Sequence, residues 1–353
     1  MTESAFLAAC RGEAASHTPV WIMRQAGRYL PEYRKLRQGT DFLTFTKTPD
    51  LAAEVTLQPV RRFELDAAIL FSDIMTPVEG MGVELEFEGG PVIRNPIRDV
   101  ESAQRLRIPD PLESVPFVLE TIRSVRTELE GSVPLIGFAG APFTLLCYLV
   151  EGHGTRTFST ARAFMYAEPD AARLLMTKLA DTMALYLKAQ AEAGAQALML
   201  FDSWVGLLAG SEFEELAAPA VARVFDQLRD LSVPLIYFPN QGGHLLQQVK
   251  RLGSDVVGID WRTPLSEARL KLGPDVTLQG NLDPAALFAP RDRLAERIDG
   301  VLRDASGEAA SDAGDAVHTP GRHIFNLGHG IDKATDPDSV AFLVDTVHER
   351  TAR

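Results

Sequence analysis

The chain has 353 residues, of which 46% are hydrophobic and 24% charged, and its formal net charge is -13 at pH 7. This composition is that of an ordinary globular protein with ample material for a core, and the acidic balance argues against non-specific nucleic-acid binding, which needs a basic surface. No apolar run reaches the roughly 18 residues that span a bilayer, and Glu3 and Arg11 flank a short apolar patch that is unlike a secretory signal. We therefore expect a cytoplasmic protein with neither a membrane nor a nucleic-acid partner.

The first distinctive stretch, residues 19–38, runs from a short apolar segment into a cluster of four arginines. Residues 20–23 are expected to form a buried strand, and Arg24 and Arg28 follow it at a spacing of four. If the backbone turns helically after Met23, both guanidinium groups lie on one face, and such planar donor forks bind carboxylates or phosphates. The spacing fits two solvated surface charges equally well, so on its own it leaves the anion site open.

Downstream, continuous apolar runs alternate with amphipathic helical patterns. Runs of this form are typical of strands buried on both faces. The expected strands are 67–71, 134–140, 195–203, 233–240, 255–260, 276–283 and 323–330. The expected helices are 31–38, 49–63, 111–130, one starting at Pro142, two within 160–193 that separate near Pro169, 211–230, 242–251, 264–272, 291–304 and 337–350. Residues 79–97 predict a small hairpin on a rim.

With the segment at 20–23, this pattern amounts to eight buried strands, each followed by a helical pattern. Such alternation is the sequence form of an α/β fold with a single (β/α)8 TIM barrel. We expect one domain over residues 1–353, with a short N-terminal segment 1–18 and a mobile loop at 305–320 that is rich in Ala, Ser, Gly and Asp. A doubly wound open sheet is the alternative fold.

In a barrel of this kind, catalytic side chains come from the carboxyl ends of the strands. The residues that end the expected strands therefore form one candidate set, joined by Tyr148 from the second turn of the helix after the third strand. The members that end strands are Arg24, Arg28, Asp73, Phe138, Ser203, Asn240, Asp260, Asn281 and His329. Asp73, Tyr148 and His329 each also have an ordinary structural alternative, in a turn, in core packing or as a buried histidine.

The candidate set lacks the ligands of a catalytic zinc, which needs three His, Cys, Asp or Glu side chains close together. It offers one histidine and no cysteine, while Cys10 and Cys147 are expected to be small buried hydrophobes. The glycines at 279–281 and 328–330 fit a phosphate site loosely and fit ordinary tight turns as well. Hydrolase chemistry is disfavoured because no nucleophile elbow surrounds Ser203. With these site types disfavoured, what remains is a site with one carboxylate among arginines, a tyrosine, a serine and a histidine.

Several longer motifs carry a resemblance to a known family. They are MRQAGRYLPEYR at 23–34, AAILFSDIMTP at 67–77, GFAGAPFTL at 137–145, FDS at 201–203 and FNLGHG at 325–330. Together they resemble the uroporphyrinogen decarboxylase family over almost the whole chain. The resemblance implies a (β/α)8 barrel that is usually a homodimer and works without cofactor or metal. It also implies the decarboxylation of the four acetate side chains of uroporphyrinogen III to methyl groups, which gives coproporphyrinogen III in tetrapyrrole (haem) biosynthesis.

The resemblance also implies roles for individual residues. Arg24, Gln25 and Arg28 match the carboxylate-binding stretch, and Asp73 matches the aspartate placed against the pyrrole N–H groups. The further matches are Tyr148, Ser203 and His329 as polar residues of the cleft and Ile69 and Phe71 as positions of backbone contact. We expect Asp73, Arg24 and Arg28 to be catalytic, with an arginine as the proton donor and His329 as the alternative. A tetrapyrrole carrier and a corrinoid-linked methyltransferase with His and Cys zinc ligands are the competing functions.

Overall fold

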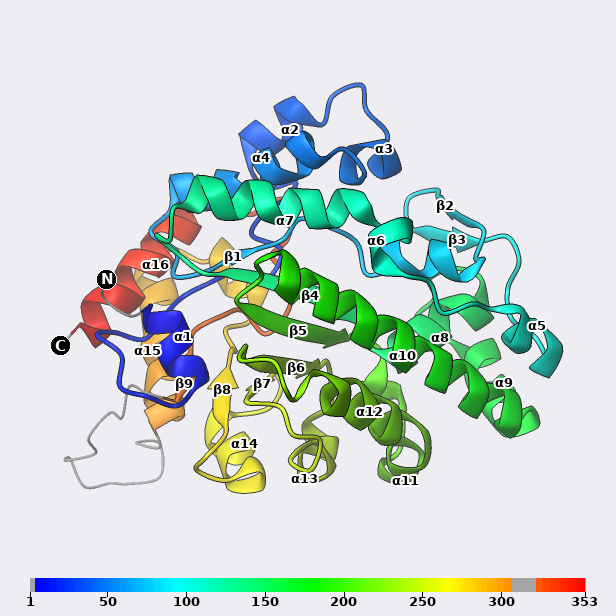
Figure 1. Cartoon of the computed structure of the whole chain (residues 1–353). Coiled ribbons are helices and arrows are strands. Elements are labelled where there is room, and N and C mark those ends of the chain that lie inside the picture. Colours follow the sequence, from blue (N-terminus) through cyan, green and yellow to red (C-terminus); the bar gives the residue numbers. More distant parts are fainter. Residues whose placement is uncertain (1–3, 307–321, 353) are drawn as a thin grey trace.

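The computed structural model describes residues 4–306 and 322–352. Its centre is a curled sheet of seven parallel strands in the spatial order β1-β4-β5-β6-β7-β8-β9 (Figure 1). The strands are β1 (Ala68–Ile69), β4 (Leu135–Gly140), β5 (Ala197–Asp202), β6 (Leu235–Pro239), β7 (Val256–Gly258), β8 (Thr277–Gln279) and β9 (His323–Ile324). Each lies within a predicted strand, although β1, β8 and β9 are much shorter than predicted, and every neighbouring pair is parallel. Most of the predicted loop 305–320 lies outside the described residues.

The segment 19–23 lies between the two outer strands of this sheet. Val20 forms a parallel bridge with Phe325 just beyond β9, and the Phe325 N–H donates to the Pro19 carbonyl at 2.8 Å. On its other side the Val20 carbonyl accepts a hydrogen bond of 2.9 Å from the Asp66 N–H, just before β1. The segment therefore closes the seven strands into a barrel, as the (β/α)8 prediction requires.

The predicted first strand is nevertheless wrong in detail, because residues 20–23 form a single bridge and no regular strand. Side chains occupy the backbone donors that a ladder would use. The Ile22 N–H donates to Gln25 Oε1 at 3.0 Å, and the Met23 N–H donates to Asn326 Oδ1 at 2.9 Å. The apolar run is fully buried as expected, but its backbone is held by polar side chains.

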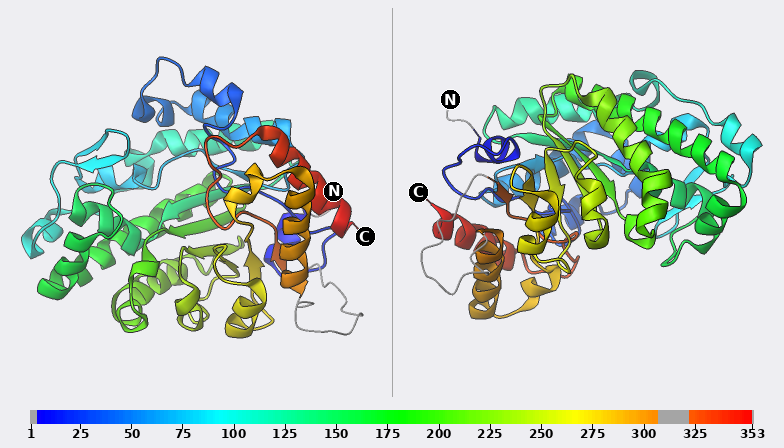
Figure 2. Two further views of the ribbon diagram at one scale, coloured as in Figure 1. Left: turned by 180° about the vertical axis from the view of Figure 1, so that it is seen from behind. Right: turned by 90° about the horizontal axis from the view of Figure 1, so that it is seen from below.

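Helices surround the sheet on its outer side, and the further views in Figure 2 show them outside the strands. The longer ones are α4 (Pro49–Arg62), α7 (Pro116–Leu129), α8 (Pro142–Glu151), α9 (Ser159–Ala167), α10 (Pro169–Ala193), α12 (Ala218–Leu228), α14 (Leu265–Leu272), α15 (Arg291–Ser306) and α16 (Pro337–Thr351). Several begin at a proline, whose fixed φ and missing N–H suit the first helical position. The predicted break at Pro169 is confirmed.

Short elements decorate the connections. They are α1 (Ala5–Cys10), α2 (Pro31–Leu36), α3 (Phe42–Thr46), α5 (Val100–Arg105), α6 (Pro111–Ser114), α11 (Gly210–Glu212), α13 (Leu246–Val249), the 3-10 turns η1 (Thr76–Met81), η2 (Val205–Leu207), η4 (Gly243–Leu245) and η5 (Pro284–Phe288), and the π-helical turn η3 (Phe213–Ala217). The predicted hairpin consists of β2 (Leu85–Phe87) and β3 (Pro91–Ile93). The sequence patterns missed α1, α3 and α5, which are too short to show a helical period.

The core lies between the sheet and its helices. The strands of the barrel centre are buried on both faces, as in β4 and β6, where every residue is buried. Cys10 and Cys147 are both buried and free, as predicted. Within residues 4–306 and 322–352, no helix combines the length and the apolar character needed to cross a bilayer.

Candidate active site

A tight turn, and no helix, follows the segment at the barrel edge. The Gln25 N–H donates to the Ile22 carbonyl at 2.8 Å, and Arg24 has a φ of 67°. A turn with positive φ at its third residue normally carries glycine there, because a side chain crowds its own backbone. The prediction that Arg24 and Arg28 share a helical face is therefore wrong. Strain of this kind in a non-glycine residue is typical of functional sites.

Gln25 fixes that turn to the sheet. Its side chain is fully buried, with Oε1 accepting from the Ile22 N–H and Nε2 donating to the Ala67 carbonyl at 3.1 Å. Both ends of the amide are thus engaged inside the protein. The geometry supports a positioning role for Gln25 and gives no support to the predicted contact between its side chain and a substrate.

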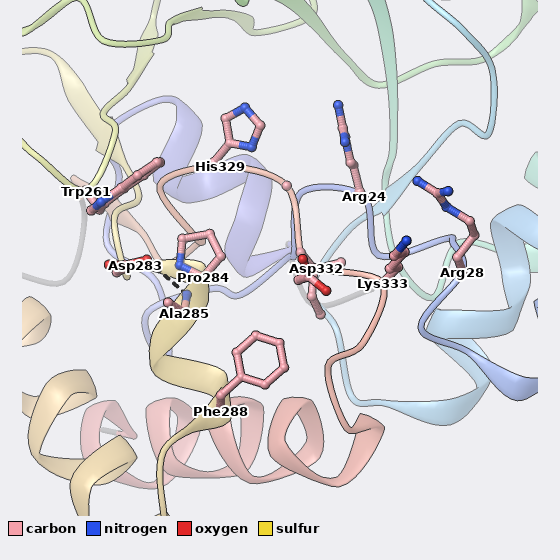
Figure 3. A pocket seen from close by; sticks show the side chains of 12 residues that line it. Arg24, Arg28, Trp261, Asp283, Pro284, Ala285, Phe288, His329, Asp332 and Lys333 are labelled. Atoms are coloured by element: carbon pink, nitrogen blue, oxygen red, sulfur yellow. Dashed lines mark hydrogen bonds between the residues drawn. The ribbon is translucent and has the colours of Figure 1, made fainter. Parts of the chain in front are cut away.

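Both arginines face one cavity of about 500 Å³. Figure 3 shows Arg24 and Arg28 beside each other on one side of it and Trp261 on the other. The lining residues are Arg24, Arg28, Trp261, Asp283, Pro284, Ala285, Phe288, His329, Gly330, Ile331, Asp332 and Lys333. The two guanidinium groups therefore line the same cavity, as the sequence predicted, although a turn and not a helix brings them together.

The cations of this cavity have no acidic partner within the described part of the chain. Among residues 4–306 and 322–352, no carboxylate lies within the 4.0 Å salt-bridge distance of Arg24, Arg28 or Lys333. The chain carries a net charge of -13, so carboxylates are abundant elsewhere. Unneutralised guanidinium groups in a concave site favour an anionic ligand with carboxylate or phosphate groups.

The glycines of the predicted 328–330 motif allow close packing around this cavity. A Cβ atom on Gly330 would stand 2.4 Å from Cδ of Arg24, and one on Gly328 would stand 2.3 Å from the Trp261 backbone nitrogen. Neither glycine has a positive φ. The motif therefore makes room for Arg24 and Trp261.

His329 lies between these glycines and is half-buried, with its ring edge-to-face against Trp261 at a centroid distance of 6.2 Å. Burial, followed by the nearby charges of Arg24 and Arg262, lowers the pKa of His329 to about 4. At neutral pH the imidazole is therefore uncharged. It can donate or accept a hydrogen bond, but very little of it is in the protonated form that could act as an acid.

Asp73 follows β1 and is half-buried. One carboxylate oxygen, Oδ1, accepts a hydrogen bond from the Met75 N–H at 2.8 Å. Burial raises the pKa of Asp73, while that N–H and the charge of Arg24 act in the opposite direction. A carboxylate poorly solvated by water is strongly stabilised when a positive charge develops next to it.

Tyr148 of α8 lies near the same charges. Its ring packs edge-to-face on Phe158 at 5.4 Å and on Trp204 at 6.3 Å. Burial raises the pKa of Tyr148, with Asp73 raising it and Arg24 lowering it to a smaller extent. The charges of Arg24 and Asp73 therefore both act on the Tyr148 hydroxyl.

Three further predicted contact residues lie in or just beyond strands β1 and β5. Ile69 is buried within β1. The Phe71 N–H donates to Thr56 Oγ1 at 2.9 Å, so this backbone donor is engaged inside the protein. Ser203 is half-buried at the end of β5, and its carbonyl accepts from Asn240 Nδ2 at 2.9 Å. Contacts of these residues with a substrate remain predictions.

The structure adds one buried acid that the candidate set overlooked. Asp202, the last residue of β5, is fully buried and accepts hydrogen bonds from Thr144 Oγ1 at 2.7 Å and from the Tyr237 hydroxyl at 2.8 Å. Burial raises its pKa to about 6 even though both hydrogen bonds act to lower it. Asp202 therefore fastens the end of β5 to the first turn of α8, the helix that carries Tyr148.

Other residues of the site gave no clear signal in the sequence. Trp261 follows Asp260, the last residue of a predicted strand, by one position, which could have marked it. Phe288 ends the short 3-10 turn η5 and Lys333 lies in a loop, and neither belongs to a motif. Asn281, from the predicted set, has a structural role, because its amide donates to the carbonyls of Asp260 and Thr263 at 3.0 and 2.7 Å.

Comparison with known proteins places the chain among relatives of one kind. The family model described as uroporphyrinogen decarboxylase (URO-D) matches residues 1–350. Proteins named uroporphyrinogen decarboxylase are 49% identical in Syntrophotalea carbinolica, covering 98% of this chain and 97% of that protein, and 48% identical in Trichlorobacter lovleyi, covering 99% of each. Another, in Myxococcus xanthus, is 48% identical and covers 97% of this chain and 95% of that protein.

Solved structures confirm the fold independently. A methyltransferase from Methanosarcina mazei superposes with a TM-score of 0.79 at 20% identity and covers 98% of each chain. A B12-independent methionine synthase from Shewanella superposes with a TM-score of 0.56 at 12% identity, covering 95% of this chain and 96% of the other. At such identities the likeness concerns the fold alone. The family match and the identities of 48–49% over nearly complete chains show that this chain belongs to the uroporphyrinogen decarboxylase family.

Proposed function

We propose that this protein is a carboxy-lyase that removes the four acetate carboxyl groups of uroporphyrinogen III, gives coproporphyrinogen III, and serves tetrapyrrole (haem) biosynthesis without a cofactor. The observation that carries the proposal is the cavity in which Arg24 and Arg28 have no acidic partner among residues 4–306 and 322–352, while the charge of Arg24 also acts on the Asp73 carboxylate. The names of the full-length relatives support the same reaction.

The two arginines bind side-chain carboxylates of the substrate. A tetrapyrrole with acetate and propionate groups presents many carboxylates around a flat ring, and bidentate guanidinium pairing suits that geometry. Lys333 lines the same cavity and adds a third positive charge at its edge. Apolar surface from Trp261 and Phe288 faces the ring system in this arrangement.

The reaction needs an electron sink, because loss of CO₂ from an acetate leaves an electron pair on its methylene carbon. Protonation of a pyrrole ring carbon turns the ring into a cation that accepts this pair as the C–C bond breaks and CO₂ leaves. A second proton then adds to the methylene carbon, which becomes a methyl group, and the ring carbon loses its proton. Each acetate therefore consumes one proton overall, and the substrate supplies the chemistry that a cofactor otherwise provides.

Asp73 stabilises the cationic ring in this scheme. Its Oδ1 is engaged with the Met75 N–H, which leaves the second oxygen to accept pyrrole N–H groups. Opposite charges about 4 Å apart interact by roughly 4 kcal/mol at an effective dielectric constant of about 20, which corresponds to about three powers of ten in rate. The carboxylate is fixed before the reaction begins, so no reorganisation is needed when the charge forms.

The proton for the ring carbon comes from the arginine side of the cavity, through Arg24 or Arg28 and a water molecule held by it. A guanidinium group stays charged at any ordinary pH, so the arginine acts by polarising that water. His329 is the weaker alternative, because its pKa of about 4 leaves it uncharged at neutral pH. His329→Asn should therefore keep most of the turnover and the pH profile, whereas Arg24→Lys should change both.

The reaction is tested by anaerobic incubation with freshly reduced uroporphyrinogen III, followed by oxidation and chromatographic separation of porphyrins by carboxylate number. Stepwise products down to the coproporphyrin level are expected without added metal or cofactor. Binding without any decarboxylation would indicate a carrier and overturn the proposal.

The electrostatic role is tested by Asp73→Asn, which keeps the shape and removes the charge. The expected loss is about 1,000-fold in kcat. Asp110→Asn is the matched control, because Asp110 is exposed and also accepts the N–H two residues further on, at 2.9 Å from Leu112. Near-normal turnover of Asp73→Asn would contradict the electrostatic account.

We further propose a cytoplasmic homodimer, in line with the family resemblance of the motifs around Arg24 and Asp73. Light scattering coupled to size-exclusion chromatography measures the mass of the purified protein, and a mass of one chain would contradict the dimer. Cell fractionation with an antibody to the chain tests the location.

A further inference from the structure

A cluster of two histidines and one aspartate lies away from the cavity, at the opposite end of the barrel strands. His17 Nε2 lies 2.7 Å from Asp66 Oδ1, and His348 Nε2 lies 2.8 Å from Asp66 Oδ2. Asp66 precedes β1 and His348 belongs to the last turns of α16. The amino ends of barrel strands serve stability and not catalysis, so this cluster has no place in the decarboxylation.

The three side chains converge as metal ligands do. One ligand atom from each residue lies within 4.8 Å of the ligand atoms of the other two. The imidazole rings meet edge-to-face with centroids 4.5 Å apart. Both Nε2 atoms are directed at the same carboxylate. A cation that replaces the two N–H···O contacts would therefore have two nitrogen ligands from the histidines and one oxygen ligand from Asp66.

The surroundings hold this arrangement in place. The Val20 N–H donates to Asp66 Oδ2 at 2.7 Å, which fixes the carboxylate. Ser16 Oγ lies 2.9 Å from Nδ1 of His17. A hydrogen bond to the second ring nitrogen is the usual support of a ligating histidine, because it sets the tautomer and the ring orientation.

The cluster is accessible from solvent but not freely exposed. The side chains of His17, Asp66 and His348 retain 24%, 14% and 21% of their exposure. A cation can therefore enter, and water can complete its coordination. Two imidazoles and one carboxylate are the nitrogen and oxygen donors that Zn²⁺ accepts in proteins, with a water molecule in the fourth position.

We propose that His17, Asp66 and His348 form a binding site for a divalent transition metal of the zinc type. Coordination uses the lone pair of each Nε2, so the ring proton resides on Nδ1, where Ser16 Oγ accepts it from His17. The bound ion would join the segment that carries His17, the start of β1 and helix α16. His17 is 49 residues and His348 is 282 residues away from Asp66 in the sequence. Such a link stabilises the folded state by the binding free energy of the ion.

The test is isothermal titration of the EDTA-treated, dialysed full-length protein with Zn²⁺ alone, together with visible absorption after addition of Co²⁺. We expect one Zn²⁺ per chain, a visible Co²⁺ spectrum that Zn²⁺ removes, and a higher Tm in the presence of Zn²⁺. His17→Gln and His348→Gln should each weaken Zn²⁺ binding at least about tenfold. His153→Gln is the matched control, because His153 is exposed and outside the cluster.

Far-UV circular dichroism verifies that each variant is folded before titration. Absence of Zn²⁺ binding by the wild-type protein would overturn the proposal, and so would binding that survives in both His17→Gln and His348→Gln. Decarboxylation is measured in parallel and should not change in His17→Gln. The outcome is thus independent of the proposed reaction, which the porphyrin assay tests separately.

Discussion

Replacing Asp202 by asparagine should change the pH dependence of stability in a direction that is fixed by its burial. Asp202 is fully buried, and its pKa rises from 3.8 to about 6 in the folded protein. A carboxyl group with a raised folded pKa contributes stability below its unfolded pKa and loses that contribution as the pH rises through the folded pKa. With about 1.4 kcal/mol per pH unit, the loss over the whole titration is about 3 kcal/mol.

Asparagine cannot ionise, so the Asp202→Asn variant escapes this loss. Its amide can still pair with Thr144 Oγ1 and the Tyr237 hydroxyl, which rotate to suit. The free energy of unfolding of the variant minus that of the wild type should therefore rise by about 2 kcal/mol from pH 4.5 to pH 8. His329, whose lowered pKa reduces stability as the pH falls from about 6.5 to about 4, contributes equally to both proteins and cancels.

Urea unfolding monitored by circular dichroism at a series of pH values measures this difference. Tyr237→Phe is the informative companion, because it removes a hydrogen bond that lowers the pKa of Asp202. In that variant the loss of stability should be centred at a higher pH. A difference between Asp202→Asn and wild type that is the same at pH 4.5 and pH 8 would refute the reasoning.

Three further substitutions test the geometry around the arginines. Arg24→Gly should be about 1 kcal/mol more stable in urea unfolding than Arg24→Ala, because residue 24 has a positive φ that glycine tolerates. Both variants should lose porphyrinogen decarboxylation. Equal stability of the two variants would contradict backbone strain at this position. Gly330→Ala should lower kcat/KM roughly 10- to 100-fold, since its Cβ would stand 2.4 Å from Arg24 Cδ, and unchanged kinetics would show that Arg24 can move freely. Gln25→Leu should destabilise the protein by about 2–4 kcal/mol in urea, because it leaves the Ile22 N–H and the Ala67 carbonyl buried without partners, and wild-type stability would refute this role.

The barrel could be predicted because strands buried on both faces are continuous apolar runs, and helical patterns follow each of them. The exception is the first strand. Its apolar run is like the others, but its backbone donors pair with side chains such as Asn326 Oδ1, which is 303 residues away from Met23. No local pattern carries that information, so periodicity alone could not reveal that a bridge replaces a regular strand.

The site was predicted in part for a similar reason. Residue type and spacing pointed to Arg24 and Arg28 as an anion clamp, but the turn that brings them to one cavity depends on the amide of Gln25. Its hydroxyl group made Ser203 the candidate at the end of β5. The raised pKa of its neighbour Asp202 depends on burial, which residue type alone does not reveal. Lys333 reaches the cavity from a loop and Phe288 from the short 3-10 turn η5, where neither a helical period nor a motif marks a side chain.

The bridge between Val20 and Phe325 has a consequence for how the chain is made. During synthesis, at about 5–20 residues per second, the segment 19–23 leaves the ribosome roughly 15–60 s before its partner beyond β9 exists. Until then the edge of this segment that faces β9 has no final neighbour, although its other edge can already pair with the chain just before β1. Closure of the barrel must be the last step of assembly, and a nascent chain stalled before residue 325 would expose a surface that chaperones bind.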